Sequence, residues 1–412
     1  MPKTSKILLL AASVVLVLGV FLGVNSSGVR AATDGQQGAY RQINVYSEVL
    51  QHIQDQYVTE PNIPAVTNGA LRGLLESLDA DSSYLTPADY KAYSADQGGK
   101  AQVGINVSKR FGYAAVVSVV EDSPADKAGL NDGDILEAID GKDTRNISLA
   151  MIQRMLAGAP GTTVSVGVVR PNKAEPDTIT MTRVLVNEPP VKEDQYENAS
   201  ILYLKPEILD VQHVDEVQSR LKQMSKDGNK KILLDLRDVA AGDMGQAIRL
   251  ANFLLSGQTI GSLEGQKYPK ETFTAEPSKA INTSAPVVVL VNRGTAGPAE
   301  LVAAALLDDK RADVVGEKTF GEGSREKTFQ LPDGGALILT VAKYESPSGI
   351  KLQDDGVTPN VPVSSGLDDQ ADVEDENLPP ANGATPAPVK KPSIQVDQQL
   401  TKALDLLKAK PA

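Results

Sequence analysis

The side chains that most often carry hydrolytic chemistry are scarce in this chain of 412 residues. It has no cysteine, which excludes thiol nucleophiles, disulfides and thiolate metal sites together. Its two histidines, His52 and His213, lie in no cluster, so a Ser-His-Asp triad or a histidine-rich zinc site is poorly supplied. We therefore predict no metal and no cofactor. Hydroxyl and amine side chains remain, and they can serve as nucleophile and base where they lie within hydrogen-bonding distance of each other.

The overall composition limits the partners and the size of the cores. The formal net charge is −12, which argues against a nucleic-acid partner because binding phosphates requires a cationic surface. The chain has no Trp and only 6 Phe and 11 Tyr, so Val, Leu, Ile and Ala must fill its cores. Its length exceeds what one compact core usually accommodates, and we expect two or more domains.

The N-terminal end carries a targeting pattern. Lys3 and Lys6 precede an uncharged, mostly apolar run, Ile7 to Val24, and small and polar residues and then Val29-Arg30-Ala31-Ala32 follow it. A basic region, an apolar region and a small-residue site are typical of a secretory signal, but the run is also close to the roughly 20 residues that span a bilayer. We expect residues 1–32 to be a cleaved signal peptide or a retained membrane anchor. Either alternative places the rest of the chain outside the cytoplasm, in the cell envelope or periplasm.

Changes in periodicity divide the rest of the chain into segments. Apolar residues at helical spacing predict a helical segment over 37–98, and β-branched runs with glycine turns and two short helices predict a small mixed α+β domain over 99–173. Strands alternating with helices over 174–365 predict an α/β sheet with crossover connections. The acidic, Pro- and Ala-rich residues 366–394 are expected to form a disordered linker, and residues 395–410 a final amphipathic helix.

The middle domain resembles a PDZ module of the bacterial protease type. Its segment SPADKAGLNDGDILEAIDGKD is similar to the core that these modules share, and VGINV stands where they have the carboxylate-binding loop and the strand that follows it. Main-chain N–H groups beside Gly104 could hold a terminal carboxylate, and the strand edge could accept a peptide as an added strand. The alternative is that Gly104 only permits a turn. We favour peptide binding, by Val103, Gly104, Ile105, Asn106 and Val107.

The flanking segments resemble the carboxyl-terminal processing, or tail-specific, serine peptidases. The similarity is carried by ALRGLLESLDADSSYLTPADY before the middle domain, by APVVVLVNRGTAGPAELVAAALLDDKRADVVGEKTFGEGS after it, and by DQQLTKALDLL near the end. It runs in family order from Tyr40 to Leu407. It implies a multidomain α/β protein with a protease-type core, an inserted mixed α+β PDZ domain and an N-terminal helical segment. It does not imply catalysis, because function depends on the residues at the site.

Active members of this family use a serine nucleophile that a lysine activates, and both positions differ here. The serine motif G-S-A-S-A-S-E corresponds to GTAGPAE, which places Gly297 at the serine position. The lysine motif F-G-K-G-[ST] corresponds to FGEGS, which places Glu322 at the lysine position. Glu326 stands where some members have an assisting glutamine. The family spacing between the two positions is kept, so the alignment leaves neither the hydroxyl nor the amine in place.

The oxyanion hole of the family is altered as well. One of its donors is the main-chain N–H of the residue after the serine, and here that residue is Pro298, which has no N–H. The other comes from a D-L-R-N-N-P-G-G turn, for which this chain has DLRDVAAG. Losing one such donor typically costs about 100- to 1,000-fold in rate. Gly297 and Pro298 instead form a good helix start, with Glu300 in the first turn.

Three functional hypotheses follow. The first is a proteolytically inactive relative that binds polypeptide C-terminal tails, unfolded protein or an active protease through its PDZ domain and remnant cleft. The second is an active serine-type peptidase with a displaced site, in which Thr295 or Ser324 is the nucleophile and Lys318 the base. The third is a mainly structural envelope protein whose PDZ domain helps to assemble homo-oligomers. The first is our leading prediction.

Overall fold

The computed structural model describes residues 40–95, 101–110, 112–170, 176–187, 189–224, 226–365 and 397–411. The expected signal segment, 1–32, and the expected linker, 366–394, lie outside these described residues. By its internal contacts the chain divides into two compact units, residues 1–70 and 71–412. Each unit is described by itself.

The N-terminal unit is helical. Residues 40–56 form one helix, and helix α2 (Ile63–Glu76) begins before the unit ends. No helix within the described ranges is long and apolar enough to cross a membrane. The helical pattern predicted over residues 37–98 is interrupted in the second unit by strand β1 (Ser83–Leu85), and it resumes in helix α3 (Pro87–Ser94). Because β1 is buried and pairs with a distant strand, tertiary contact overrides the local pattern there.

The mixed α+β domain contains a sheet in the order β2-β3-β4-β6-β7, with β5 paired to β4. Its core forms where apolar side chains of helix α5 and the sheet meet, among them Ile152, Leu136 and Val166, all fully buried. Strand β2 ends the sheet, so one of its edges is open to an added strand. The elements are β2 (Ile105–Arg110), β3 (Tyr113–Val119), α4 (Pro124–Lys127), β4 (Ile135–Ile139), β5 (Lys142–Asp143), α5 (Leu149–Leu156), β6 (Thr163–Val169) and β7 (Asp177–Thr182).

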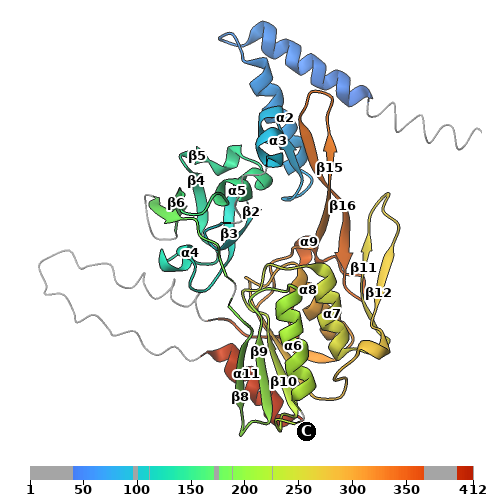
Figure 1. The fold of residues 1–412 in the computed structure, drawn as a ribbon. Coiled ribbons are helices and arrows are strands. Elements are labelled where there is room, and N and C mark those ends of the chain that lie inside the picture. Colours follow the sequence, from blue (N-terminus) through green and yellow to red (C-terminus); the bar gives the residue numbers. More distant parts are fainter. Residues whose placement is uncertain are drawn as a thin grey trace, which may run out of the picture. The chain divides into compact units, whose positions relative to one another are not determined.

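The larger domain is built on a mainly parallel sheet in the order β17-β14-β13-β10-β9-β8 (Figure 1). Strand β13 reads VVVLV and is buried throughout, as expected for a parallel strand covered on both faces. Its Val289 packs with helices α6, α7 and α8, and its Val288 with helix α11. The elements are β8 (Lys192–Tyr196), β9 (Ile201–Lys205), α6 (Val211–Gln223), β10 (Lys231–Asp235), α7 (Met244–Leu254), β13 (Val287–Val291), α8 (Pro298–Asp308), β14 (Ala312–Gly316), β17 (Val361–Pro362) and α11 (Gln398–Ala409).

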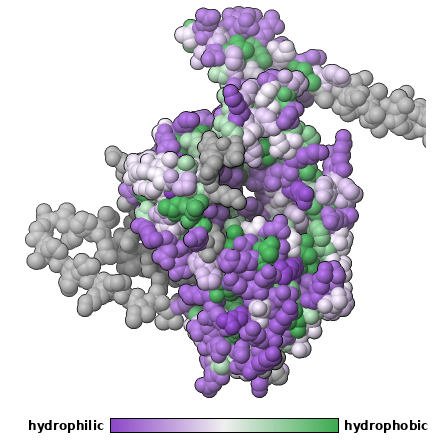
Figure 2. All heavy atoms as spheres, in the orientation of Figure 1, coloured by the Kyte–Doolittle hydropathy of each residue, from purple (hydrophilic) through white to green (hydrophobic). Residues whose placement is uncertain are grey.

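A second sheet has the order β1-β16-β11-β12, with strand β15 paired to β16. Figure 1 shows β15 and β16 as a long hairpin. The face of the molecule in Figure 2 is mainly hydrophilic. The elements are β11 (Thr259–Glu264), β12 (Glu271–Thr274), β15 (Ser324–Gln330), β16 (Ala336–Glu345) and the short helix α9 (Leu352–Asp355). The predicted multidomain α/β fold, with a mixed α+β domain and an N-terminal helical segment, is confirmed.

Candidate functional site

Gly297 lies at a sharp turn between strand β13 and helix α8. Its backbone has φ +56° and ψ −117°, a conformation that only glycine adopts without strain. A side-chain carbon added at Gly297 would meet no atom within 4 Å, so the position faces open space. Pro298 follows as the first residue of α8. A strained strand-to-helix turn with an open position is the geometry that exposes a nucleophile in many hydrolases. Here the turn is kept and carries no hydroxyl.

The Glu300 side chain joins the turn at Gly297 to the loop that contains Glu322. Its side chain is completely buried, and its carboxylate accepts hydrogen bonds from the main-chain N–H groups of Gly297 at 3.0 Å, Gly321 at 2.8 Å and Glu322 at 2.7 Å. The Thr319 hydroxyl also donates to it. Burial raises the pKa of Glu300 to about 7 despite these four bonds, which favour the ionised form. The buried carboxylate therefore fixes the turn at Gly297 and the loop that contains Glu322 against each other.

Glu322, at the position where the family has a lysine, lies in a group of carboxyl side chains. Burial, followed by the nearby Asp81, Glu300 and Glu326, raises its pKa to about 8. Burial also raises the pKa of Asp81, to about 6. Among the described residues, no Lys or Arg side chain forms an ion pair with any of these four acids. The position at which the family has its basic lysine is therefore acidic here, and the Glu322 carboxyl group is mostly protonated near neutral pH.

Ser324, the first residue of β15, is hydrogen-bonded within this acidic group. Its hydroxyl lies 2.8 Å from the Asp81 carboxylate and also contacts Glu326. Gln353 donates to the same Asp81 oxygen at 3.1 Å and accepts from the Gly323 N–H at 2.8 Å. Sequence reasoning missed Asp81 and Gln353, because Asp81 precedes the region by more than 200 positions and no local pattern marks either residue.

The structure does not bring Thr295 and Lys318 together. Thr295 is completely buried, and its hydroxyl donates to the carbonyl of Leu236 at 2.8 Å and accepts from the Asn292 N–H at 3.0 Å. Lys318 is exposed and lines a cavity together with residues such as Val357, and neither Thr295 nor Ser324 lines that cavity. Within the part of the chain that is described, no hydrogen bond joins any two of Thr295, Lys318 and Ser324.

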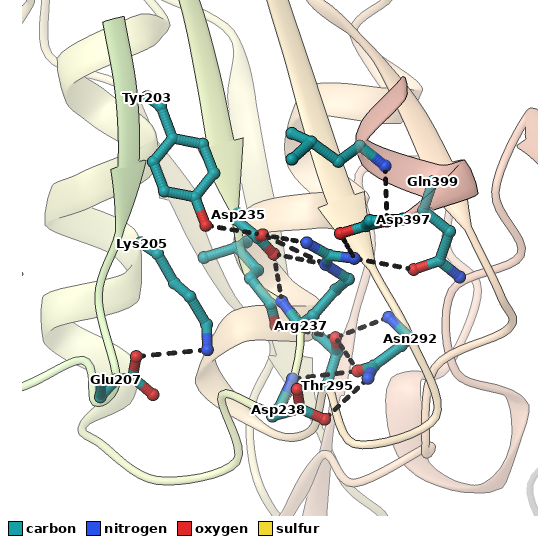
Figure 3. A network of polar contacts seen from close by, with 12 residues as sticks. Tyr203, Lys205, Glu207, Asp235, Arg237, Asp238, Asn292, Thr295, Asp397 and Gln399 are labelled. Atoms are coloured by element: carbon teal, nitrogen blue, oxygen red, sulfur yellow. Dashed lines mark hydrogen bonds and ion pairs between the residues drawn. The ribbon is translucent and has the colours of Figure 1, made fainter. Parts of the chain in front are cut away.

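The turn that would supply the second oxyanion donor is tied to Asn292 (Figure 3). The Asp238 N–H donates to the Asn292 side-chain carbonyl at 2.9 Å, and the Asn292 amide donates to the Asp238 carboxylate at 2.7 Å. Asp238 has a positive φ of 65°. Nearby, Arg237 donates to Asp235 and to Asp397, the residue that caps helix α11. The Asp238 N–H is thus bonded to Asn292, and the network joins the segments that follow strands β10 and β13 at the centre of the sheet.

Four of the five expected peptide-binding residues, all but Gly104, line a groove between strand β2 and helix α5. Gly104 has φ +84°, and a side-chain carbon there would lie 2.2 Å from the Ser123 Cβ, so the loop can only be built with glycine. Val103, Ile105, Asn106 and Val107 all line the groove; the other residues lining it are Gln102, Val117, Gln153, Leu156, Ala157, Ala240 and Glu322. We call this cavity the β2–α5 groove. It brings the mixed α+β domain next to the loop of Glu322.

His213 forms a separate polar contact away from this region. It is almost fully buried at the start of α6, where its Nδ1 lies 2.7 Å from the Asp210 carboxylate and its Nε2 lies 2.9 Å from the Pro189 carbonyl. Both neighbours only accept hydrogen bonds, so both contacts are satisfied when the ring is doubly protonated. Burial lowers the pKa of His213, but these hydrogen bonds, that with Asp210 first, raise it overall. We assign this residue a structural role.

Comparisons with known proteins identify relatives of both domains. Residues 200–363 match peptidase family S41, and residues 116–170 match the PDZ domain family. A carboxy-terminal-processing protease of Bartonella bacilliformis is 31% identical over 363 residues, which cover 85% of this chain and 82% of the relative. A carboxyl-terminal-processing protease of Synechocystis is also 31% identical, over 89% of each chain.

A solved structure gives the same result for the fold. The photosystem II D1 C-terminal processing protease superposes with a TM-score of 0.64 and 25% identity, over 77% of this chain and 86% of that one.

Proposed function

Because this chain belongs to the carboxyl-terminal processing proteases of peptidase family S41, we propose that it is a proteolytically inactive member that binds polypeptide C-terminal tails through its PDZ domain. We place the PDZ domain at residues 99–173 and the protease-like core at 174–365. We also propose that residues 1–32 direct export, so that the protein acts in the cell envelope. Its partners are the tails of other proteins, including an active protease that it would regulate or deliver substrate to.

The observation that carries this proposal is the turn at Gly297. The turn keeps an open position and a positive φ, but the residue has no hydroxyl and the next residue has no N–H. Removing a serine nucleophile costs on the order of a million-fold in a comparable hydrolase. At the lysine position Glu322 presents a carboxyl group instead of an amine, and Gly297 offers no nucleophile for it to deprotonate.

The displaced-site alternative finds little support in the geometry. A nucleophile must lie within hydrogen-bonding distance of its base and must reach the substrate. The Thr295 hydroxyl is buried and fully engaged, and Lys318 lies beside a different cavity. The Ser324 hydroxyl is hydrogen-bonded to titratable groups, but these are the carboxylic acids Asp81 and Glu326 and not an amine. Ser324 is therefore the position to mutate in any test for residual activity.

The experiment is a hydrolysis assay on the full-length protein with fluorogenic peptides and an unfolded protein substrate. We expect no turnover above buffer for wild type and for Ser324→Ala alike. In parallel, fluorescence anisotropy with labelled peptides that end in a free carboxylate should show binding, which amidation of the C-terminus should weaken. Cleavage by wild type that disappears in Ser324→Ala would overturn the claim of inactivity. Failure of every free tail to bind would favour the alternative of a structural assembly role.

A further inference from the structure

The β2–α5 groove is lined in part by an acidic residue that comes from outside the PDZ domain. The groove is lined by the peptide-binding face of β2 and α5, which is apolar at Val103, Ile105 and Leu156. Glu322 comes from the protease-like core and lines the same cavity. A tail that lies along β2 with its carboxylate at Gly104 therefore runs past a carboxyl group from another domain.

The Glu322 carboxyl group has no partner of its own. Among the described residues it forms no hydrogen bond and no ion pair, although its main-chain N–H is bound to Glu300. Its neighbours Asp81, Glu300 and Glu326 are acidic, and they add to the cost of ionising it. A carboxyl group that lines a groove without a partner favours a ligand with a cationic side chain, because that side chain supplies both a hydrogen-bond donor and a charge opposite to that of the carboxylate.

We propose that the β2–α5 groove selects polypeptide tails that carry a lysine or arginine a few residues before the free C-terminus, with the cationic group meeting Glu322. This inference rests on the proposed function, since it specifies which tails the PDZ domain takes. The apolar residues of the groove hold the aliphatic part of the tail, and the loop at Gly104 holds its carboxylate. A basic side chain adds a charge-assisted contact that a neutral tail lacks.

A protonation change accompanies this contact. The pKa of Glu322 is about 8, so near neutral pH the group is mostly protonated in the free protein. Binding a lysine or arginine favours the ionised form and releases a proton to solvent. The facing acids are Asp81 and Glu300, whose pKa values are also raised by burial, together with Glu326. The preference for a basic tail should therefore grow as the pH rises from about 6 to about 8.5.

The test measures a preference between two peptides with the full-length protein. A lysine is placed in turn at each of the last six positions of one free tail, and each peptide is compared with its glutamine counterpart by isothermal titration calorimetry. We expect one position at which lysine binds about 10-fold more tightly than glutamine at pH 8. At that position the heat should differ between buffers of different ionisation enthalpy, because a proton is released.

The matched variants are Glu322→Gln and Glu121→Gln, the second at an exposed turn of the PDZ domain. Glu322→Gln should reduce the lysine preference to about one and abolish its pH dependence, while Glu121→Gln should keep both. A cooperative unfolding transition verifies that each variant is folded. If free tails bind without any lysine preference, or if the preference persists in Glu322→Gln, this inference alone is wrong. If no tail binds at all, the proposed function fails together with it.

Discussion

Replacing Glu322 by glutamine is expected to flatten the pH dependence of the stability of this protein. In the folded state the pKa of Glu322 is raised from its ordinary value of 4.5 to about 8, chiefly by burial and then by its acidic neighbours. In the unfolded chain the same group titrates near its ordinary value. Between these two pKa values the folded state keeps a proton that the unfolded state has lost, so the free energy of unfolding falls as the pH rises.

The size of the effect follows from one proton. Each proton by which the two states differ changes the free energy of unfolding by about 1.4 kcal/mol per pH unit. Over the two units from about pH 5 to pH 7, Glu322 alone should lower the stability by about 3 kcal/mol. Glutamine resembles the protonated acid in size and charge, so Glu322→Gln should match wild type near pH 5 and exceed it by about this amount near pH 7. Such a difference is a large share of the 5 to 15 kcal/mol that stabilises a typical domain.

Urea unfolding monitored by circular dichroism at pH 5, 6 and 7 provides the measurement. The quantity compared is the slope of the unfolding free energy against pH, in wild type, Glu322→Gln and the exposed control Glu121→Gln. The control should keep the wild-type slope. An equal slope in wild type and Glu322→Gln would refute the reasoning, because it would mean that Glu322 is ionised at the same pH in the folded and unfolded states.

Three further outcomes are expected. The combined change Gly297→Ser, Pro298→Ala and Glu322→Lys should produce measurable peptide hydrolysis with a rate that rises toward alkaline pH, since the surrounding carboxylates keep the new amine protonated; a fluorogenic assay checks this, and activity without the lysine substitution would contradict it. Replacing His213 by glutamine should lower stability below about pH 6.5, where the raised pKa contributes fully, and matter less as the pH rises through the folded pKa; urea unfolding at pH 5.5 and pH 9 tests the sign. Gly104→Ala should abolish binding of free tails in an anisotropy assay, because the added carbon collides with the neighbouring turn; unchanged affinity would show that the loop takes no part.

Strong periodicity and capping made much of the parallel-sheet domain predictable. The helices expected between the strands over residues 174–365 are observed as α6, α7 and α8, with caps at Asp210, Asp243 and Gly297. The buried strand β13 was equally visible, because an uninterrupted run of β-branched residues suits a sheet covered on both faces. In these elements local sequence preferences and tertiary packing agree.

Strand β15 shows why other elements could not be predicted. It reads SREKTFQ and is mostly exposed, so it has no alternation of apolar and polar residues to reveal it. Its extended form comes from pairing with β16 along the whole strand. The same applies to the acidic group around Glu322. Asp81 reaches it through the pairing of β1 with β16, a contact between segments far apart in the chain that no local pattern encodes.

Helix α11 has a practical consequence for any work with shortened versions of this protein. Its Ala403 and Leu407 are buried against Tyr203, Val288 and other apolar side chains on one face of the parallel sheet. A version that ends before Asp397 would expose the apolar side chains of that face to water. Exposed apolar surface of this kind promotes association between molecules. Such a truncated protein should precipitate or form aggregates for reasons unrelated to its binding or catalytic chemistry, so a negative assay with it would carry no information about function.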